Sequence, residues 1–136
     1  MLTDLQNFLT NQTTVTDIVG SQIWLFHLPS PAIYPAVTLH VISTTQGHNL
    51  DGRDSYVKSR IQVDSWSNSY AQATALADAI GDLIDGFTGV MGSTTFGAIL
   101  SPDEDGAENH FYEQPADGGN FGLYHIASDY FCFYFE

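Results

Sequence analysis

The stretch that decides the fold spans residues 53–87 and reads RDSYVKSRIQVDSWSNSYAQATALADAIGDLIDGF. Between residues 56 and 66, apolar or small side chains alternate with polar ones, which is the pattern of a strand with one buried face. One side carries Val57, Ser59, Ile61, Val63 and Ser65, and the other carries Lys58, Arg60, Gln62 and Asp64. The sequence therefore predicts a half-buried strand with two cations on its outward side.

A helix is predicted directly after this strand. Ser67-Asn68-Ser69 offers side chains that can cap a helix N-terminus, and Asp85-Gly86 can close the helix because glycine adopts left-handed backbone easily. The apolar residues between them recur at helical spacing: Tyr70, Ala73, Leu76, Ala77, Ile80, Leu83 and Ile84. We expect an amphipathic helix here.

The residues before this unit predict a helix and then a strand. Residues 2–9 follow a helical period, and residues 15–19 can form a second short helical turn before a glycine. Residues 23–26 are a short apolar run, either a strand or a packing segment. Residues 36–44 alternate like a strand, and residues 45–54 contain turn formers that suit a protruding hairpin loop.

The C-terminal part predicts two more strands around an acidic loop. Residues 94–100 read as a strand broken by Gly97, and residues 101–119 as a long acidic loop without a basic residue. Residues 121–135 read as a long strand that is apolar on both faces near its end, so we expect a helix to cover one face and a partner subunit the other. The prediction is one α+β domain over residues 1–136, in the order α-β-β-α-β-β. Its sheet is roughly four-stranded and antiparallel, with the long amphipathic helix packed on one face.

The composition limits the function. The 136 residues are 43% hydrophobic, enough for one core, and 3 basic against 16 acidic residues leave a net charge of -13. Few cations argue against a protein that wraps nucleic acid, because such binding neutralises phosphates with Lys and Arg. A salt-rich habitat would favour the same composition. Cys132 is the one cysteine, which excludes an intramolecular disulfide and indicates a buried thiol. No secretory signal or membrane span is recognised, so we expect a chain made in a cytoplasm without a membrane partner.

The sequence gives no positive support for catalysis, a metal or a cofactor. Residues 103–108 supply oxygen ligands but not the spacing of an EF-hand, which favours a solvated acidic loop over a calcium site. The five histidines are scattered without zinc-site spacing, and no serine lies in a nucleophile elbow. We therefore expect no enzymatic activity.

Arg60 and Asp64 lie on one side of the predicted strand, four residues and roughly 13 Å apart. They cannot pair within the strand, but each can reach a neighbouring strand or another subunit. In a chain with three cations, an outward arginine is a natural contact for an acidic surface of another copy. An arginine that snorkels at a sheet edge explains the pattern equally well.

The motif Arg60-Ile61-Gln62-Val63-Asp64-Ser65-Trp66 resembles the tail-completion family of long-tailed bacteriophages, also described as tail terminator or tail-to-head joining proteins. The matching positions that follow it are Tyr70, Ala73, Leu76-Ala77 and Gly86-Phe87. Further matches occur in order at Val19-Gly20, Ile23-Trp24, Leu28-Pro29, Pro35-Ala36-Val37 and residues 124–130. The resemblance covers most of the chain, although the acidic loop is longer and more charged than the family leads us to expect.

The resemblance implies a structural virion protein without enzymatic activity, located at the tail or neck. Such a subunit forms a ring, commonly a hexamer, that ends the tail tube and joins it to the head connector. The implied partners are further copies, the tail-tube protein and a connector or neck protein, while DNA passes through the channel without specific binding. Candidate interface residues are Lys58, Arg60, Asp64, Tyr130, Phe133 and Phe135. The alternative is a free-standing α+β domain that binds a ligand or acts as an enzyme.

Overall fold

The computed structural model describes residues 1–50, 52–102, 108–114 and 122–135. The N-terminal elements are α1 (Leu2–Thr10), α2 (Thr13–Val19), β1 (Ile23–Leu25), β2 (Ala36–Asn49) and β3 (Gly52–Ser67). The elements that follow are α3 (Tyr70–Ile84), β4 (Gly89–Met91), β5 (Thr94–Leu100), β6 (Glu108–Glu113) and β7 (Leu123–Phe135).

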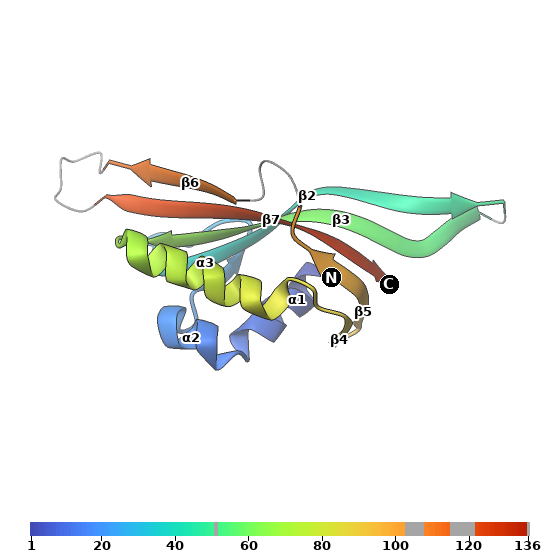
Figure 1. The fold of residues 1–136 in the computed structure, drawn as a ribbon, viewed down its shortest axis with the longest axis horizontal. Coiled ribbons are helices and arrows are strands. Elements are labelled where there is room, and N and C mark those ends of the chain that lie inside the picture. The colour runs from blue at the N-terminus through green and yellow to red at the C-terminus, as the bar shows by residue number, and fades with distance from the viewer. Residues whose placement is uncertain (51, 103–107, 115–121, 136) are drawn as a thin grey trace.

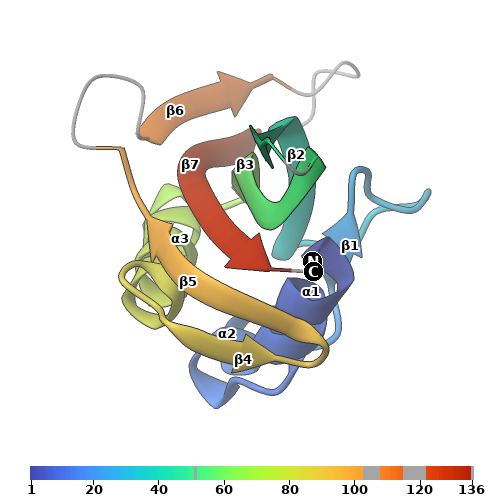
Figure 2. The ribbon, with the colours of Figure 1, turned by 90° about the vertical axis from the view of Figure 1, so that its right-hand side faces the viewer.

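The sheet is larger than the sequence predicted. Its strands lie in the order β1-β2-β3-β7-β5-β4, and β6 also pairs with β7, beyond the end of β5. β1 runs parallel to β2, whereas the other pairs are antiparallel. The α+β class is confirmed, but the expected four-stranded antiparallel sheet is wrong. Among the described residues the sheet is mixed and seven-stranded, and three helices accompany it. The sheet is curled (Figures 1 and 2). Strands of three residues, such as β1 and β4, are too short to show a period in the sequence.

The helix predicted after the central strand is confirmed at Tyr70–Ile84. The Ser69 side chain accepts a hydrogen bond from the Gln72 backbone N–H, which caps the N-terminus. Gly86 follows the end of α3 with a φ of 81°, the left-handed conformation that glycine allows. Local sequence signals therefore set the limits of this helix.

The hydrophobic core lies between the sheet and the three helices, which gather on one side of it (Figures 1 and 2). The side chains that are fully buried there include Leu5, Leu9, Val15, Leu39, Ile61, Leu76, Ile80, Ile84, Phe96 and Ile99. The side of β3 that was predicted to be buried, with Val57, Ile61 and Val63, is buried. Helix α3 thus covers one face of the long strands.

The long hairpin β2–β3 projects beyond the body of the molecule (Figure 1). A protruding loop was expected over residues 45–54, but the two strands continue to Asn49 and Gly52 and remain paired there. Irregularities in their register fall between Val41 and Ser43 and between Gln46 and His48. These shifts bend the hairpin. Hydrogen bonds between the two strands extend them through a segment whose turn-forming residues predicted a loop.

Two expectations for the C-terminal part have different outcomes. The break expected at Gly97 is confirmed as a register shift between Phe96 and Ala98. The long loop expected over residues 101–119 is interrupted by β6, which pairs along β7. Residues 103–107, which hold most of the oxygen ligands weighed against a solvated loop, and residues 115–119 lie outside the described part of the chain.

Candidate interaction surface

The side of the sheet that faces away from the helices carries a row of partly exposed side chains. Register pairs Lys58 with Phe133 and Arg60 with Phe131 across β3 and β7. Phe135 is 43% exposed at the end of the row, whereas the intervening residues of β7 point to the core. We call the following six residues the open face: Tyr56, Lys58, Arg60, Phe131, Phe133 and Phe135.

The two cations of the open face lie over aromatic rings. Lys58 Nζ is 4.7 Å from the centre of the Phe131 ring and 5.5 Å from that of Phe133. Arg60 Cζ is 5.9 Å from the centre of the Phe131 ring. Tyr56 stacks on Phe133 with ring centres 6.1 Å apart. Cation–π attraction holds these charges close to the surface, on a partly exposed apolar base.

Arg60 also forms an ion pair with Asp129 of β7. Its Nε donates to Asp129 Oδ2 at 3.2 Å, and its Nη2 donates to the same oxygen. Asp129 is 7% exposed, while the Arg60 side chain is 42% exposed. The reach to a neighbouring strand that the sequence predicted is thus realised, but the partner is in the same chain. Asp129 itself was not singled out, because only the β3–β7 register places it near Arg60.

Asp64 is the centre of a second, polar cluster on the same side of the sheet. Its Oδ1 accepts hydrogen bonds from Gln62 Nε2 and His125 Nε2, both at 2.7 Å. Its Oδ2 accepts one from Thr38 Oγ1 at 3.3 Å. Asp64 was expected on an outward face, and it does lie on that side, but it is only 4% exposed. Its hydrogen-bond donors Thr38, Gln62 and His125 surround its carboxylate.

Two of the scattered histidines meet at Asp64. His125 stacks on Trp66 with ring centres 3.9 Å apart and a 10° angle between the planes. His40 Nδ1 lies 3.4 Å from Asp64 Oδ2 and has no hydrogen-bond partner in the described part of the chain. No group of three or more potential ligands in that part is placed to hold a metal ion. The alternation of β2 and β3 puts His40 and Asp64 on the same side of the sheet, but their contact depends on the β2–β3 register, as that of His125 depends on the pairing with β7.

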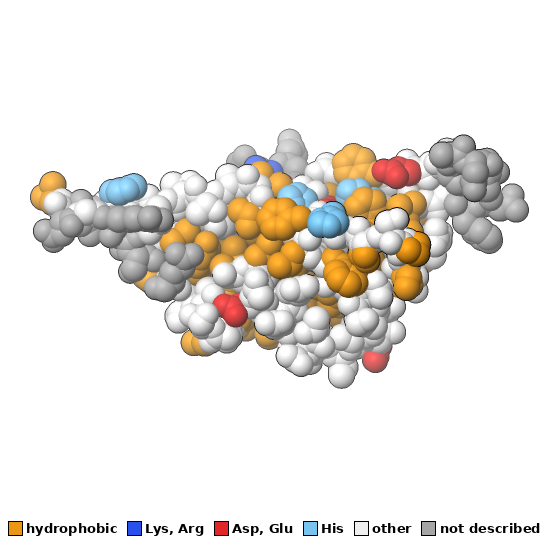
Figure 3. Space-filling view, turned by 180° about the vertical axis from the view of Figure 1, so that it is seen from behind, with side chains coloured by type: hydrophobic (Ala, Val, Ile, Leu, Met, Phe, Trp, Pro, Cys, Tyr) orange, Lys and Arg blue, Asp and Glu red, His pale blue; other side chains and the backbone are white. Residues whose placement is uncertain are grey.

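Apolar side chains continue beyond the open face toward β1, β2 and β6. Those with large exposed fractions are Trp24, Phe26, Ile42 and Phe111. Figure 3 views the molecule from the side opposite α3 and shows hydrophobic side chains spread across this face between histidines. Lys and Arg appear only at its upper edge. Such a surface is typical of a protein–protein contact.

The six candidate interface residues fall into three positions. Lys58, Arg60, Phe133 and Phe135 belong to the open face. Asp64 is buried further along the same side. Tyr130 lies on the opposite side of β7, toward α3, and is 6% exposed. The structure thus brings four of the six together on one surface.

The family described as tail completion protein gp17 matches residues 3–99. This match extends over most of the chain and includes β3 and α3. The chain belongs to this family of phage tail completion proteins. It is therefore a structural protein of a bacteriophage tail and a component of the virion.

A solved structure with the same fold comes from a phage-like particle. One chain of the structure titled "Virion of native gene transfer agent (GTA) particle" has a TM-score of 0.71 and is 13% identical. The match covers 97% of this chain and 92% of that one, so the two chains share their fold over nearly their whole length. No curated protein matches the sequence. Among the described helices, none is long and apolar enough to cross a membrane.

Proposed function

We propose that this tail completion protein forms a ring, commonly a hexamer, at the head-proximal end of the phage tail. The ring ends the tail tube and joins it to the head connector. The family match supports a role in tail completion. The open face supports assembly, because it leaves aromatic side chains partly exposed in a protein whose sheet is covered by helices on one side only.

The observation that carries this proposal is the character of the open face. Phe133 and Phe135 are partly exposed next to Lys58 and Arg60, so apolar area and the chain's few cations share one surface. Interfaces favour aromatic residues and arginine at their centres. Burial of such a surface against another copy removes aromatic area from water, which stabilises the assembly. The proposal treats residues 1–136 as one unit, because one sheet joins strands from both ends of the chain.

The charge of the chain suits a channel through which DNA passes. With a net charge of -13, the surface repels phosphates, so DNA is expected to slide through without specific binding. Copies of the chain, the tail-tube protein and the connector or neck protein are the proposed partners. Assembly takes place in the host cytoplasm, with no cofactor and no catalytic step.

The test compares two serine variants of exposed apolar residues. Phe135→Ser removes a ring of the open face, and Val90→Ser is the control because Val90 is 65% exposed on β4, outside that face. Both variants should fold, as judged by circular dichroism, since neither side chain is in the core. We expect Phe135→Ser to weaken assembly onto tail tubes by about tenfold, the size of one interface aromatic, and Val90→Ser to assemble normally.

Assembly is measured by sedimentation with tail-tube protein and by electron microscopy of tail ends. Arg60→Ala should also reduce joining. Tails of normal length made without this protein, or substrate turnover by a single purified copy, would contradict the proposed function. Unchanged assembly of both Phe135→Ser and Arg60→Ala would exclude the open face as the contact.

A further inference from the structure

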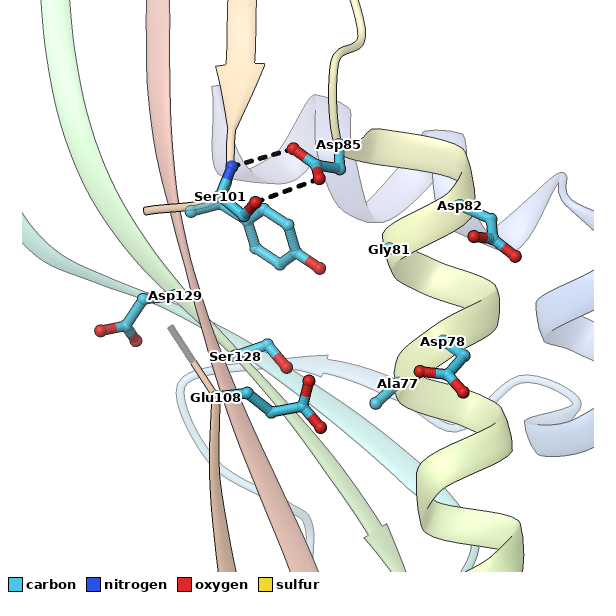
Figure 4. Close-up of a pocket in the computed structure, with 10 residues that line it drawn as sticks. Ala77, Asp78, Gly81, Asp82, Asp85, Ser101, Glu108, Ser128 and Asp129 are labelled. Atoms are coloured by element: carbon cyan, nitrogen blue, oxygen red, sulfur yellow. Dashed lines mark hydrogen bonds between the residues drawn. The ribbon is translucent and has the colours of Figure 1, made fainter. Parts of the chain in front are cut away.

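A cavity of about 450 Å³ lies between α3 and β7, on the side of the sheet opposite the open face. We call it the acidic groove, and its carboxylates come from Asp78 and Asp82 of α3, the C-cap residue Asp85, Glu108 of β6 and Asp129 of β7. Figure 4 shows Glu108 extending toward Ala77 and Asp78 of the helix, with Asp82 at the outer rim. Asp129 points away on the far side of β7 (Figure 4), where it binds Arg60. Glu108 Oε1 lies 2.8 Å from His110 Nε2, so three groove carboxylates, those of Asp78, Asp82 and Asp85, lack a basic partner among the described residues.

The carboxylates of α3 are placed at an unfavourable end of the helix. Asp82 lies in the last turn of α3, Asp85 is its C-cap and Asp78 lies one turn earlier, while no basic residue lies in the last turn. The carbonyl groups at a helix C-terminus carry negative partial charge, so acidic side chains there are repelled. Asp85 finds hydrogen bonds from the Ser101 N–H at 2.9 Å and the Ser101 hydroxyl at 3.1 Å. Asp78 and Asp82 have no such partner in the described part, so this arrangement favours a cation from outside the chain.

The hydroxyl of Tyr130 is a second, independent sign of a ligand. Tyr130 lines the groove and is 6% exposed, and its hydroxyl has no hydrogen-bond partner among the residues that the structure describes. This oxygen packs against Gly81, where a Cβ atom would lie 3.2 Å away. Burial, and then the charges of Asp85, Glu108, Asp78 and Asp82, raise the pKa of Tyr130 to about 12. The hydroxyl oxygen is not one of the fully buried unpaired atoms of the described residues, so it opens into the groove, where it can accept a hydrogen bond from a donor that enters.

The groove suits an amino or guanidinium group better than a metal ion. The described residues contain no group of three or more His, Cys, Asp or Glu side chains close enough to hold a metal. A lysine ammonium has three N–H donors on a flexible stem, so it can reach carboxylates that lie too far apart to share an ion. The Tyr130 hydroxyl can accept one of these donors.

We propose that the acidic groove of each copy receives Lys58 from the open face of the next copy in the ring. This proposal rests on the proposed ring and adds the second half of its contact. The chain has three cations, all within residues 53–60, and Arg60 is already paired with Asp129. Lys58 is exposed and has no carboxylate partner in the described residues. Charge complementarity therefore matches this lysine to the groove.

The positions of Lys58 and the groove also allow such a contact to build a ring. Lys58 and the groove lie on opposite sides of the β3–β7 pair, so one copy cannot fill its own groove with Lys58. A contact between two different surfaces is head-to-tail, and it produces a closed ring when the rotation between copies closes. The same contact covers the aromatic side chains of the open face with α3 of the neighbour.

The first test uses the unmodified protein assembled on tail-tube protein. Lys58 is the one lysine in the sequence, so a carbodiimide, which links amines to carboxylates in contact, can form an amide only from Lys58 or the N-terminus. We expect links from Lys58 to Asp78, Asp82 or Glu108, identified by mass spectrometry. A mixture of ¹⁵N-labelled and unlabelled copies shows whether each link joins two chains. Lys58→Arg keeps the charge but cannot form the link, so it is the control.

The second test is a charge exchange. Lys58→Glu and Asp78→Lys should each weaken ring assembly by about tenfold, and the double variant should recover most of it. Asp17→Lys is the control, because Asp17 is exposed on α2 and makes the same change of charge outside the groove.

The outcomes separate this contact from the ring itself. Links between chains from Lys58 to the groove, together with recovery in the double variant, support the contact. Rings whose Lys58 links elsewhere or to nothing, or a double variant no better than the single ones, overturn the contact and leave the ring in place. If no ring forms on tail-tube protein, both proposals fail.

Discussion

Removal of the Asp64 carboxylate tests whether the polar cluster on the outer side of the sheet holds three strands together. Asp64 of β3 accepts hydrogen bonds from Thr38 of β2 and His125 of β7, as well as from Gln62. It is the acceptor that joins the central strand to both of its neighbours. Asp64→Ala leaves these donors without their acceptor at a buried position, since Asp64 is only 4% exposed.

The expected loss of unfolding free energy in Asp64→Ala follows from the two short hydrogen bonds. Each 2.7 Å bond to a charged carboxylate contributes about 1.5–3 kcal/mol. The His125 side chain is 16% exposed, so water recovers part of this loss. We therefore expect Asp64→Ala to lower the free energy of unfolding by about 2–3 kcal/mol. For a chain of this length, that corresponds to a fall in Tm of about 7–10 °C.

Urea denaturation followed by circular dichroism measures this loss. Asp64→Asn keeps one acceptor oxygen and should lose about half as much, roughly 1–1.5 kcal/mol. Asp17→Ala, the removal of an exposed carboxylate on α2, should change stability by less than about 0.5 kcal/mol. If Asp64→Ala were no more destabilising than Asp17→Ala, the reasoning about the cluster would be refuted.

Two further predictions concern titratable groups. The hydrogen bond from Thr94 Oγ1 to Asp4 Oδ2, 2.6 Å long, is the main cause of a pKa for Asp4 below 3.8. Since its pKa is lower in the folded state, the Asp4 carboxylate stabilises the protein above pH 3.8, and this stabilisation is lost as the pH falls through the folded-state pKa. In urea denaturation, the difference in unfolding free energy between the wild type and Asp4→Asn should therefore shrink below about pH 4. A difference that does not change with pH would contradict this. Burial raises the pKa of the Cys132 thiol to about 12, so thiol reagents at pH 8 should modify it only after unfolding, and rapid labelling of the native protein would disprove its burial.

The sequence was a good guide wherever the signal was local. The period of residues 56–66 predicted which side of β3 is buried, and the caps and apolar spacing predicted α3 at Tyr70–Ile84. The family resemblance was carried by this same unit, and the match over residues 3–99 confirmed it. Both succeed because period and capping depend on neighbours within a few residues.

The sequence was a poor guide to the extent of the sheet. It missed β4 and β6, and it predicted loops where β2, β3 and β6 are paired strands. The hydrogen bonds that form these strands come from distant residues, as in the pairing of β6 with β7. No local period reports a partner strand of that kind.

The sequence by itself determined a buried side and an outer side for the central strand, the helix that covers one of them, the shortage of cations, and the family. Tertiary structure alone decided which outer residues meet. It joined Arg60 to Asp129, gathered His125 and Thr38 at Asp64, and enclosed Tyr130 in an acidic groove. The physical reason is that side-chain direction follows from the alternation of one strand, whereas side-chain partners follow from the register between strands far apart in the sequence.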